Sequence, residues 1–114
     1  MAPLLSKEDG RLDWDRPAVE LDRLIRGTAP WPGAWCGFRG KTLKVHAALP
    51  GADEPDVAAG TIAAVGDDGL LVRCGAGSLL LTRVQPPGKR AMGADEFLRG
   101  YRAAIGESLA ALEE

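Results

Sequence analysis

The chain has 114 residues, of which 46% are apolar, and this suffices for one domain with a modest core. A net charge of −2 does not by itself suggest nucleic acid, and two isolated cysteines with a single histidine argue against a zinc site. Fifteen glycines and eight prolines favour short strands joined by turns over a helical bundle.

The first part of the chain predicts a linker followed by an amphipathic helix. Residues 1–14 are expected to form a linker that leads into the domain of residues 15–114, with Leu12 and Trp14 extended against that domain. Apolar residues then recur at helical spacing. The helix is expected to stop at Gly27, because glycine readily takes the left-handed conformation that ends helices.

A stiff elbow is predicted directly after this helix. Pro30 and Pro32 restrict the backbone between two large aromatic residues, Trp31 and Trp35. The simplest interpretation is a bend held by aromatic packing. The alternative is that a tryptophan stays exposed and stacks on a nucleic-acid base.

Short strand-like runs follow, separated by turns that contain glycine. Their spacing of 8–12 residues is typical of a small antiparallel β-barrel. Cys36 and Cys74 lie in these apolar runs, so we expect buried, reduced thiols in a cytoplasmic protein. The predicted strands are residues 34–38, 42–49, 60–65, 70–74 and 79–84.

A second helix is predicted from Gly93 onward. Phe97, Tyr101, Ile105 and Leu109 follow one another at steps of four residues, which places them on one face of a helix. We expect this apolar stripe to plug one open end of the barrel. Two glycines within the stretch weaken the helix, and a break near either one is compatible with the sequence.

The basic residues are concentrated in two stretches that contain no acidic residue. Residues 23–52 hold five of the fourteen basic residues, and residues 69–94 hold another four. If the two stretches fold beside each other, the protein has one positive face despite its slightly acidic balance. The alternative is an ordinary surface of mixed charge.

The sequence contains no recognisable catalytic or metal-ligating set. The only histidine, His46, shares a predicted strand face with Lys44 and has no Cys, Asp or Glu beside it. We therefore expect a surface histidine or a phosphate contact, with no metal. No apolar stretch reaches the length of a membrane span. These features favour a binding domain over a catalytic one.

Several blocks of residues, in this order along the chain, resemble one known family. The most specific block is Gln85–Met92, Gln-Pro-Pro-Gly-Lys-Arg-Ala-Met. Together the blocks are similar to the carboxy-terminal domain of methionyl-tRNA formyltransferase. They cover residues 6–14, 24–27, 30–34, 40–45, 74–79, 85–92 and 97–100.

The resemblance implies a mainly β fold with two flanking helices, built as a small, open, antiparallel, OB-like β-barrel. It implies that this domain binds the backbone of initiator tRNA. An amino-terminal domain with the family's catalytic residues would transfer the formyl group from 10-formyltetrahydrofolate. This chain would then carry no catalytic residue and no cofactor of its own, would be part of a formyl-group transferase, and would act as a monomer beside that catalytic domain.

Positioning of the substrate is the mechanism that the resemblance implies for this domain. Basic side chains would neutralise phosphates and release counterions, without reading the base sequence. The predicted contacts are Lys41, Lys44, Lys89 and Arg90, with Arg39 and Arg73 behind them.

Two other functions remain open at this point. One is a structural or protein-contact domain of another formyltransferase, acting on a nucleotide sugar or on folate. The other is a free-standing enzyme. The Gln85–Met92 block fits the tRNA enzyme better than either.

Overall fold

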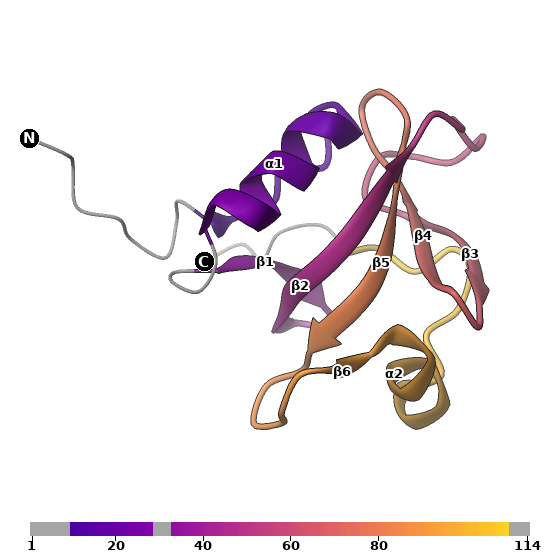
Figure 1. Cartoon of the computed structure of the whole chain (residues 1–114). Coiled ribbons are helices and arrows are strands. Elements are labelled where there is room, and N and C mark those ends of the chain that lie inside the picture. Colours follow the sequence, from indigo (N-terminus) through magenta and orange to yellow (C-terminus); the bar gives the residue numbers. More distant parts are fainter. Residues whose placement is uncertain (1–9, 29–32, 110–114) are drawn as a thin grey trace, which may run out of the picture.

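The computed structural model describes residues 10–28 and 33–109. Every predicted strand is present, with ends within two residues of those expected, and one short strand near Met92 was not predicted. Figure 1 shows the arrangement of the elements. They are α1 (Ala18–Thr28), β1 (Ala34–Phe38), β2 (Lys41–Gly51), β3 (Ile62–Gly66), β4 (Gly69–Arg73), β5 (Ser78–Gln85), β6 (Met92–Gly93) and α2 (Ala94–Tyr101).

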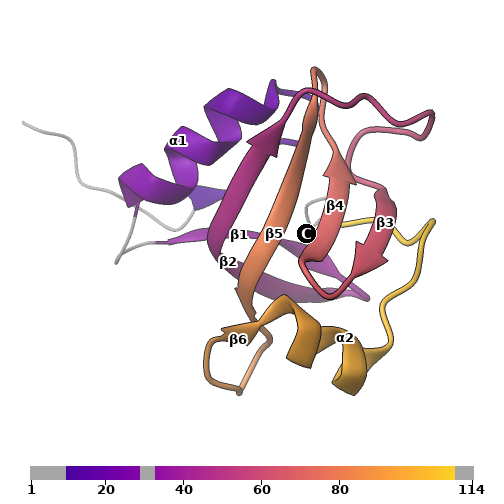
Figure 2. The ribbon, with the colours of Figure 1, turned by 45° about the vertical axis from the view of Figure 1, so that its right-hand side comes forward.

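The strands form one antiparallel sheet of six strands. Their order is β1-β2-β5-β4-β3, and β6 pairs with β5. The fold is therefore mainly β with two helices, as predicted, but the predicted barrel is only partly correct. The strands do not close into a barrel, because β1 and β3 stand at opposite ends of the order and do not pair with each other (Figures 1 and 2).

Two extended segments, one before α1 and one after α2, cover these two edge strands. The amide of Leu12 donates to the carbonyl of Trp35 in β1 (2.9 Å). The amide of Ile62 in β3 donates to the carbonyl of Glu107 (2.9 Å), and the amide of Leu109 donates to the carbonyl of Gly60, just before β3 (2.7 Å). The indole Nε1 of Trp14 then donates to the carbonyl of Leu109 (2.7 Å) and joins the two segments. Edge groups of both strands are thereby paired without a closing strand.

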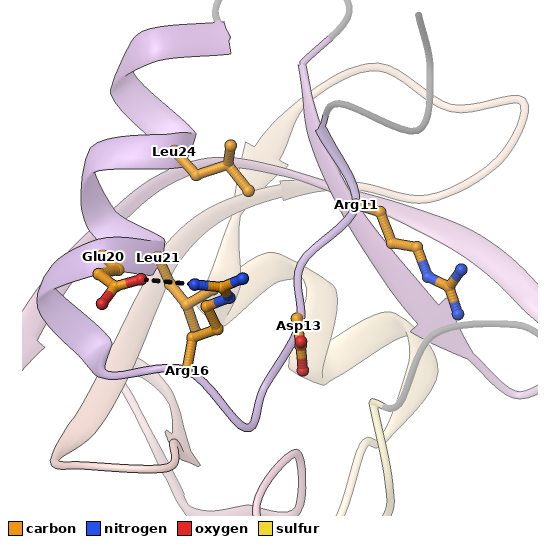
Figure 3. Close-up of a pocket in the computed structure, with 6 residues that line it drawn as sticks. All are labelled: Arg11, Asp13, Arg16, Glu20, Leu21 and Leu24. Atoms are coloured by element: carbon orange, nitrogen blue, oxygen red, sulfur yellow. Dashed lines mark hydrogen bonds and ion pairs between the residues drawn. The ribbon is translucent and has the colours of Figure 1, made fainter.

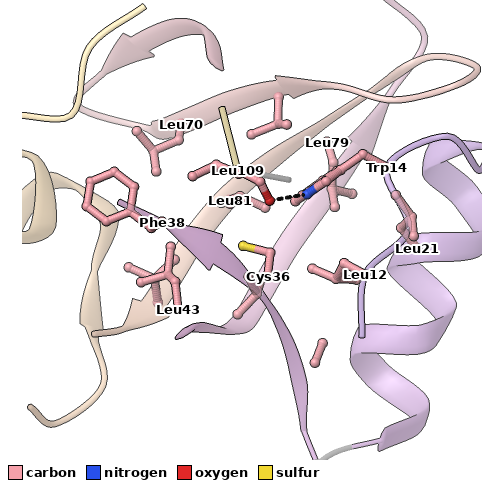
Figure 4. Packing of buried hydrophobic residues seen from close by; sticks show 14 of the residues in the cluster. Leu12, Trp14, Leu21, Cys36, Phe38, Leu43, Leu70, Leu79, Leu81 and Leu109 are labelled. Carbon is pink, nitrogen blue, oxygen red and sulfur yellow. Dashed lines mark hydrogen bonds between the residues drawn. The ribbon is translucent and has the colours of Figure 1, made fainter. Parts of the chain in front are cut away.

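The core lies between the sheet and these coverings (Figure 4). Leu12 and Trp14 are buried in it, in agreement with the expectation that they lie against the domain. The apolar stripe of α1 is buried as predicted, and Phe97 of α2 is fully buried. Cys36 and Cys74 are buried free thiols, also as predicted. Burial raises the pKa of Cys36 to about 12.

The second helix is shorter than its apolar stripe predicts. It ends at Tyr101, because Arg102 takes the left-handed conformation (φ 54°) and its amide donates to the carbonyl of Leu98 (2.8 Å). The expected continuation of the stripe is wrong, and the helix breaks beside Gly100, one of the two positions where the sequence allowed a break. Ile105 is 62% exposed, and Leu109 is buried from an extended segment.

The predicted elbow falls mostly on residues 29–32, including Trp31, which lie outside the described residues. Trp35 is described, and it is only 6% exposed. For Trp35, the alternative of an exposed ring that stacks on a nucleic-acid base is therefore wrong.

Candidate nucleic-acid interface

The pairing of β2 with β5 brings the two basic stretches of the sequence together. Lys44 lies opposite Gln85, and Ala47 lies opposite Arg83. Directly opposed residues of an antiparallel pair lie on the same face of a sheet. The loop of residues 86–91 leaves β5 at this point (Figure 1). It carries two more cations, Lys89 and Arg90.

We call the exposed set at this end of β2 and β5 the basic surface. All of its members are exposed, and among the residues that the structure describes none forms an ion pair. Its members are Lys44, Arg83, Lys89 and Arg90, with His46 beside them.

Gln85 connects the basic loop to β2. Its Nε2 donates to the carbonyl of Lys89 (2.8 Å). Since that carbonyl can only accept, Oε1 of Gln85 faces His46, whose Nε2 donates to it (2.7 Å). A turn from Pro86 to Lys89, closed by the amide of Lys89 on the carbonyl of Pro86 (3.2 Å), shapes the loop, and Gly88 supplies its positive φ of 73°.

The acidic residues of the β2–β3 loop lie at the other end of these strands. Gly51, where β2 ends, is opposite Ser78, where β5 begins. Asp53, Glu54 and Asp56 lie in the loop that follows Gly51. The pairing therefore separates this acidic loop from the basic surface by the length of β2 and β5.

Lys41 is exposed but does not join the basic surface. The register with β1 is regular from Lys41 to Val45, and three steps separate Lys41 from Lys44. Because successive strand residues alternate between faces, these two side chains leave opposite faces of the sheet.

Arg39 is used within the fold. Its Nε and Nη2 donate to the carboxylate of Glu107 (2.9 and 3.0 Å), and its Nη1 donates to the carbonyl of Tyr101 (2.8 Å). Its guanidinium also lies over the ring of Phe38, 4.6 Å from the centroid. The Arg39 guanidinium holds the pKa of Glu107 below its ordinary value of 4.5.

Arg73 is likewise occupied. It donates to the carbonyls of Pro55 (2.6 Å) and Cys74 (2.8 Å), and so ties the β2–β3 loop to the end of β4. Of the six predicted contacts, three therefore lie together, Lys41 lies apart, and two serve the structure.

Sequence reasoning missed Arg83 and Gln85 as members of this site. Arg83 lies in the acid-free stretch 69–94, and that pattern was the signal that could have included it. Gln85 carries no charge, and only its two hydrogen bonds show that it orders the loop.

Within residues 10–28 and 33–109, no group of three or more His, Cys, Asp or Glu could hold a metal ion. No helix in these residues is long and apolar enough to cross a membrane.

Known proteins resemble this chain in sequence or in fold. Residues 4–102 match the family described as formyl transferase, C-terminal domain. The methionyl-tRNA formyltransferase of Myxococcus xanthus is 50% identical over 106 residues, covering 93% of this chain and 33% of that protein. The enzyme of the same name from Gluconacetobacter diazotrophicus is 46% identical over 108 residues, covering 95% and 34%.

This chain therefore spans about a third of the length of these relatives. Among solved structures, a crystal structure of HypX from Aquifex aeolicus matches with a TM-score of 0.72, over 94% of this chain and 19% of that one. At 18% identity, this likeness shows the fold alone.

Proposed function

Because the chain belongs to the formyl transferase C-terminal domain family, we propose that it holds the initiator tRNA substrate of a methionyl-tRNA formyltransferase by its phosphate backbone. The observation that carries this proposal is the basic surface. Lys44, Arg83 and the loop cations are gathered by the β2–β5 register, and the acidic β2–β3 loop lies at the far end. An exposed group of unpaired cations is the feature that a polyanion recognises.

Binding would act by positioning. Each phosphate that meets a lysine or arginine releases counterions, so the affinity is electrostatic and does not depend on base sequence. Gln85 supports this because it holds the loop against β2 before the RNA arrives, which lowers the entropy lost on binding.

The rest of the enzyme enters as part of the same proposal. An amino-terminal catalytic domain would transfer the formyl group from 10-formyltetrahydrofolate to the methionyl-tRNA. The present domain would keep the tRNA within reach of that catalytic domain. Its open sheet would serve where an OB-like barrel was expected, and the enzyme would act as a monomer in the cytoplasm. The fold likeness to HypX, at 18% identity, does not favour a different substrate.

Binding of tRNA at rising salt tests the proposal. The chain is titrated with labelled initiator tRNA between about 50 and 300 mM salt, and log K should fall linearly with log salt. In the double variant Lys89→Ala, Arg90→Ala, affinity should fall and the slope should flatten by up to about two, since roughly one counterion is released per lost phosphate contact.

A matched control removes two cations elsewhere. The double variant Arg16→Ala, Arg23→Ala changes the net charge by the same amount, but at one position before α1 and one on it. It should keep the wild-type dependence of log K on log salt. Absence of binding at low salt, or equal slopes for both double variants, would contradict the proposal.

A further inference from the structure

A hollow of about 380 Å³ lies at the foot of the basic loop. Lys89 of the loop, Met92 of β6, and Glu96, Gly100 and Tyr101 of α2 line it. Its size falls within the range of sites that bind small molecules.

One wall of this hollow is aromatic and rigidly held. The ring of Tyr101 stacks on Phe97 (4.9 Å between centroids, 24° between planes) and meets Phe38 edge-on (6.2 Å, 77°). Phe97 is fully buried, so this support is anchored in the core. Met92 adds a second, half-buried apolar surface. Such walls suit a flat aromatic ligand, and nucleic-acid bases stack on tyrosine in this way.

The two charged groups of the hollow are available to a ligand. Within the described part of the chain, neither the Lys89 ammonium nor the Glu96 carboxylate has an ion-pair or side-chain hydrogen-bond partner. In two other hollows of the described chain, one arginine is paired with a carboxylate. Figure 3 shows Arg16 bound to Glu20 beside α1 (3.2 Å), and Arg99 binds Asp95 in the hollow near β3 (3.5 Å).

The unpaired Glu96 carboxylate can distinguish between nucleic-acid bases by the donors they present. It accepts two parallel hydrogen bonds from a pair of adjacent donors, and the Watson–Crick edge of guanine presents N1–H and N2–H₂ side by side. Adenine and cytosine each present one amino group on this edge, and uracil presents one imino group. The Lys89 ammonium would meet the phosphate of the same nucleotide.

We infer that this hollow binds an unpaired guanine nucleotide, with the base beside Tyr101, its donor edge on Glu96 and its phosphate on Lys89. The inference rests on the proposed function, since the guanine would belong to the bound tRNA. It adds a base-selective contact to a surface that otherwise reads only phosphates.

Filling the hollow is the sharpest test, because Gly100 allows it without disturbing the fold. A Cβ at Gly100 meets nothing within 4 Å, and leucine favours a helix more than glycine does. The variant Gly100→Leu should therefore remain folded, which a thermal melt checks. Gly27→Leu is the matched control, since Gly27 is also helical with open space around it and is remote in sequence from every lining residue.

The ligands are GMP, AMP, CMP and UMP, followed by short RNA hairpins that carry one unpaired G or A. Chemical-shift titration should show GMP binding at least about tenfold tighter than the other three nucleotides. Gly100→Leu should abolish this binding and Gly27→Leu should not. Glu96→Gln should remove the preference for GMP.

Equal affinity for all four nucleotides, or GMP binding that survives in Gly100→Leu, would overturn the inference. Binding of GMP with no preference between the two hairpins would overturn the assignment of the base to tRNA. Failure of the proposed function is a separate result. It would appear as absent or salt-independent binding of tRNA by the unaltered chain, whatever the nucleotide titrations show.

Discussion

Arg39 and Glu107 stabilise the fold through a contact that spans 68 positions of sequence. Arg39 sits in the turn between β1 and β2 with a positive φ of 52°, and Glu107 lies in the segment that follows α2. Their two hydrogen bonds, and the bond from the Ala104 amide to Glu107 (2.7 Å), pin that segment to the β1–β2 turn. An acid-free sequence window could not reveal a partner so far away.

This ion pair predicts a pH dependence of stability. The hydrogen bond from Arg39 lowers the pKa of Glu107, so the folded state holds its proton less tightly than the unfolded state. The pair therefore stabilises the fold above the ordinary value of 4.5, and its contribution is lost as pH falls through the lower folded value. The difference in unfolding free energy between wild type and Glu107→Gln should be full at neutral pH and vanish in acid.

Urea unfolding at a series of pH values measures this difference. Glu96→Gln removes a carboxylate that has no ion-pair partner in the described part of the chain, and serves as the control. If the difference in unfolding free energy between wild type and Glu107→Gln stayed constant from about pH 7 down to about pH 3, this account would be contradicted.

At the scale of elements, the join between β4 and β5 depends on a close approach to the chain before α1. The amide of Gly75 donates to the carbonyl of Arg16 (3.0 Å), and the amide of Ala18 donates to the carbonyl of Ala76 (2.9 Å). A Cβ on Gly75 would lie 1.8 Å from the carbonyl oxygen of Asp15. Only glycine allows the two backbones to meet at this distance.

The variant Gly75→Ala should therefore be destabilised by about 2–4 kcal/mol, at the upper end of single substitutions. Gly27→Ala, where a Cβ meets nothing within 4 Å, should be neutral or stabilising by up to about 1 kcal/mol. Urea unfolding of both variants measures the contrast. Equal changes in unfolding free energy for the two variants would mean that the backbone at Gly75 can move away from Asp15 without loss of stability.

On the scale of the whole molecule, the open sheet is completed by segments from the two ends of the described chain. The Trp14 indole is the direct link between them, and the core packs around it (Figure 4). Trp14 is only 4% exposed and Leu109 is fully buried. Water therefore cannot easily replace a lost partner of the Leu109 carbonyl.

Replacing Trp14 by Phe removes this hydrogen bond and keeps an aromatic ring. The unfolding free energy should fall by about 1–3 kcal/mol, because a buried carbonyl is left unpaired. Amide exchange of Leu109, whose N–H bonds the carbonyl of Gly60, should accelerate more than that of residues in β5. If amide exchange accelerated equally across the whole sheet, the Trp14–Leu109 hydrogen bond would not be a local link between the two segments.

Local patterns predicted most of the fold. Alternation and glycine turns placed β1 to β5 within two residues, and the α1 stripe faces the core as its spacing requires. The sequence left the end of α2 open between Gly100 and Gly106. The helix ends beside Gly100, where Arg102 takes the left-handed conformation and the following segment pairs beside β3. The basic surface was predicted in part, since Lys44, Lys89 and Arg90 lie together.

Sequence alone determined the strands, the family resemblance and the two stretches free of acid, because each depends on neighbours along the chain. Tertiary structure decided which cations share a face and which are bound within the fold. The β2–β5 register opposes Lys44 to Gln85, strand alternation turns Lys41 away, and Glu107 occupies Arg39. The physical reason is that charge acts through space, and only the folded backbone sets distances between residues remote in sequence.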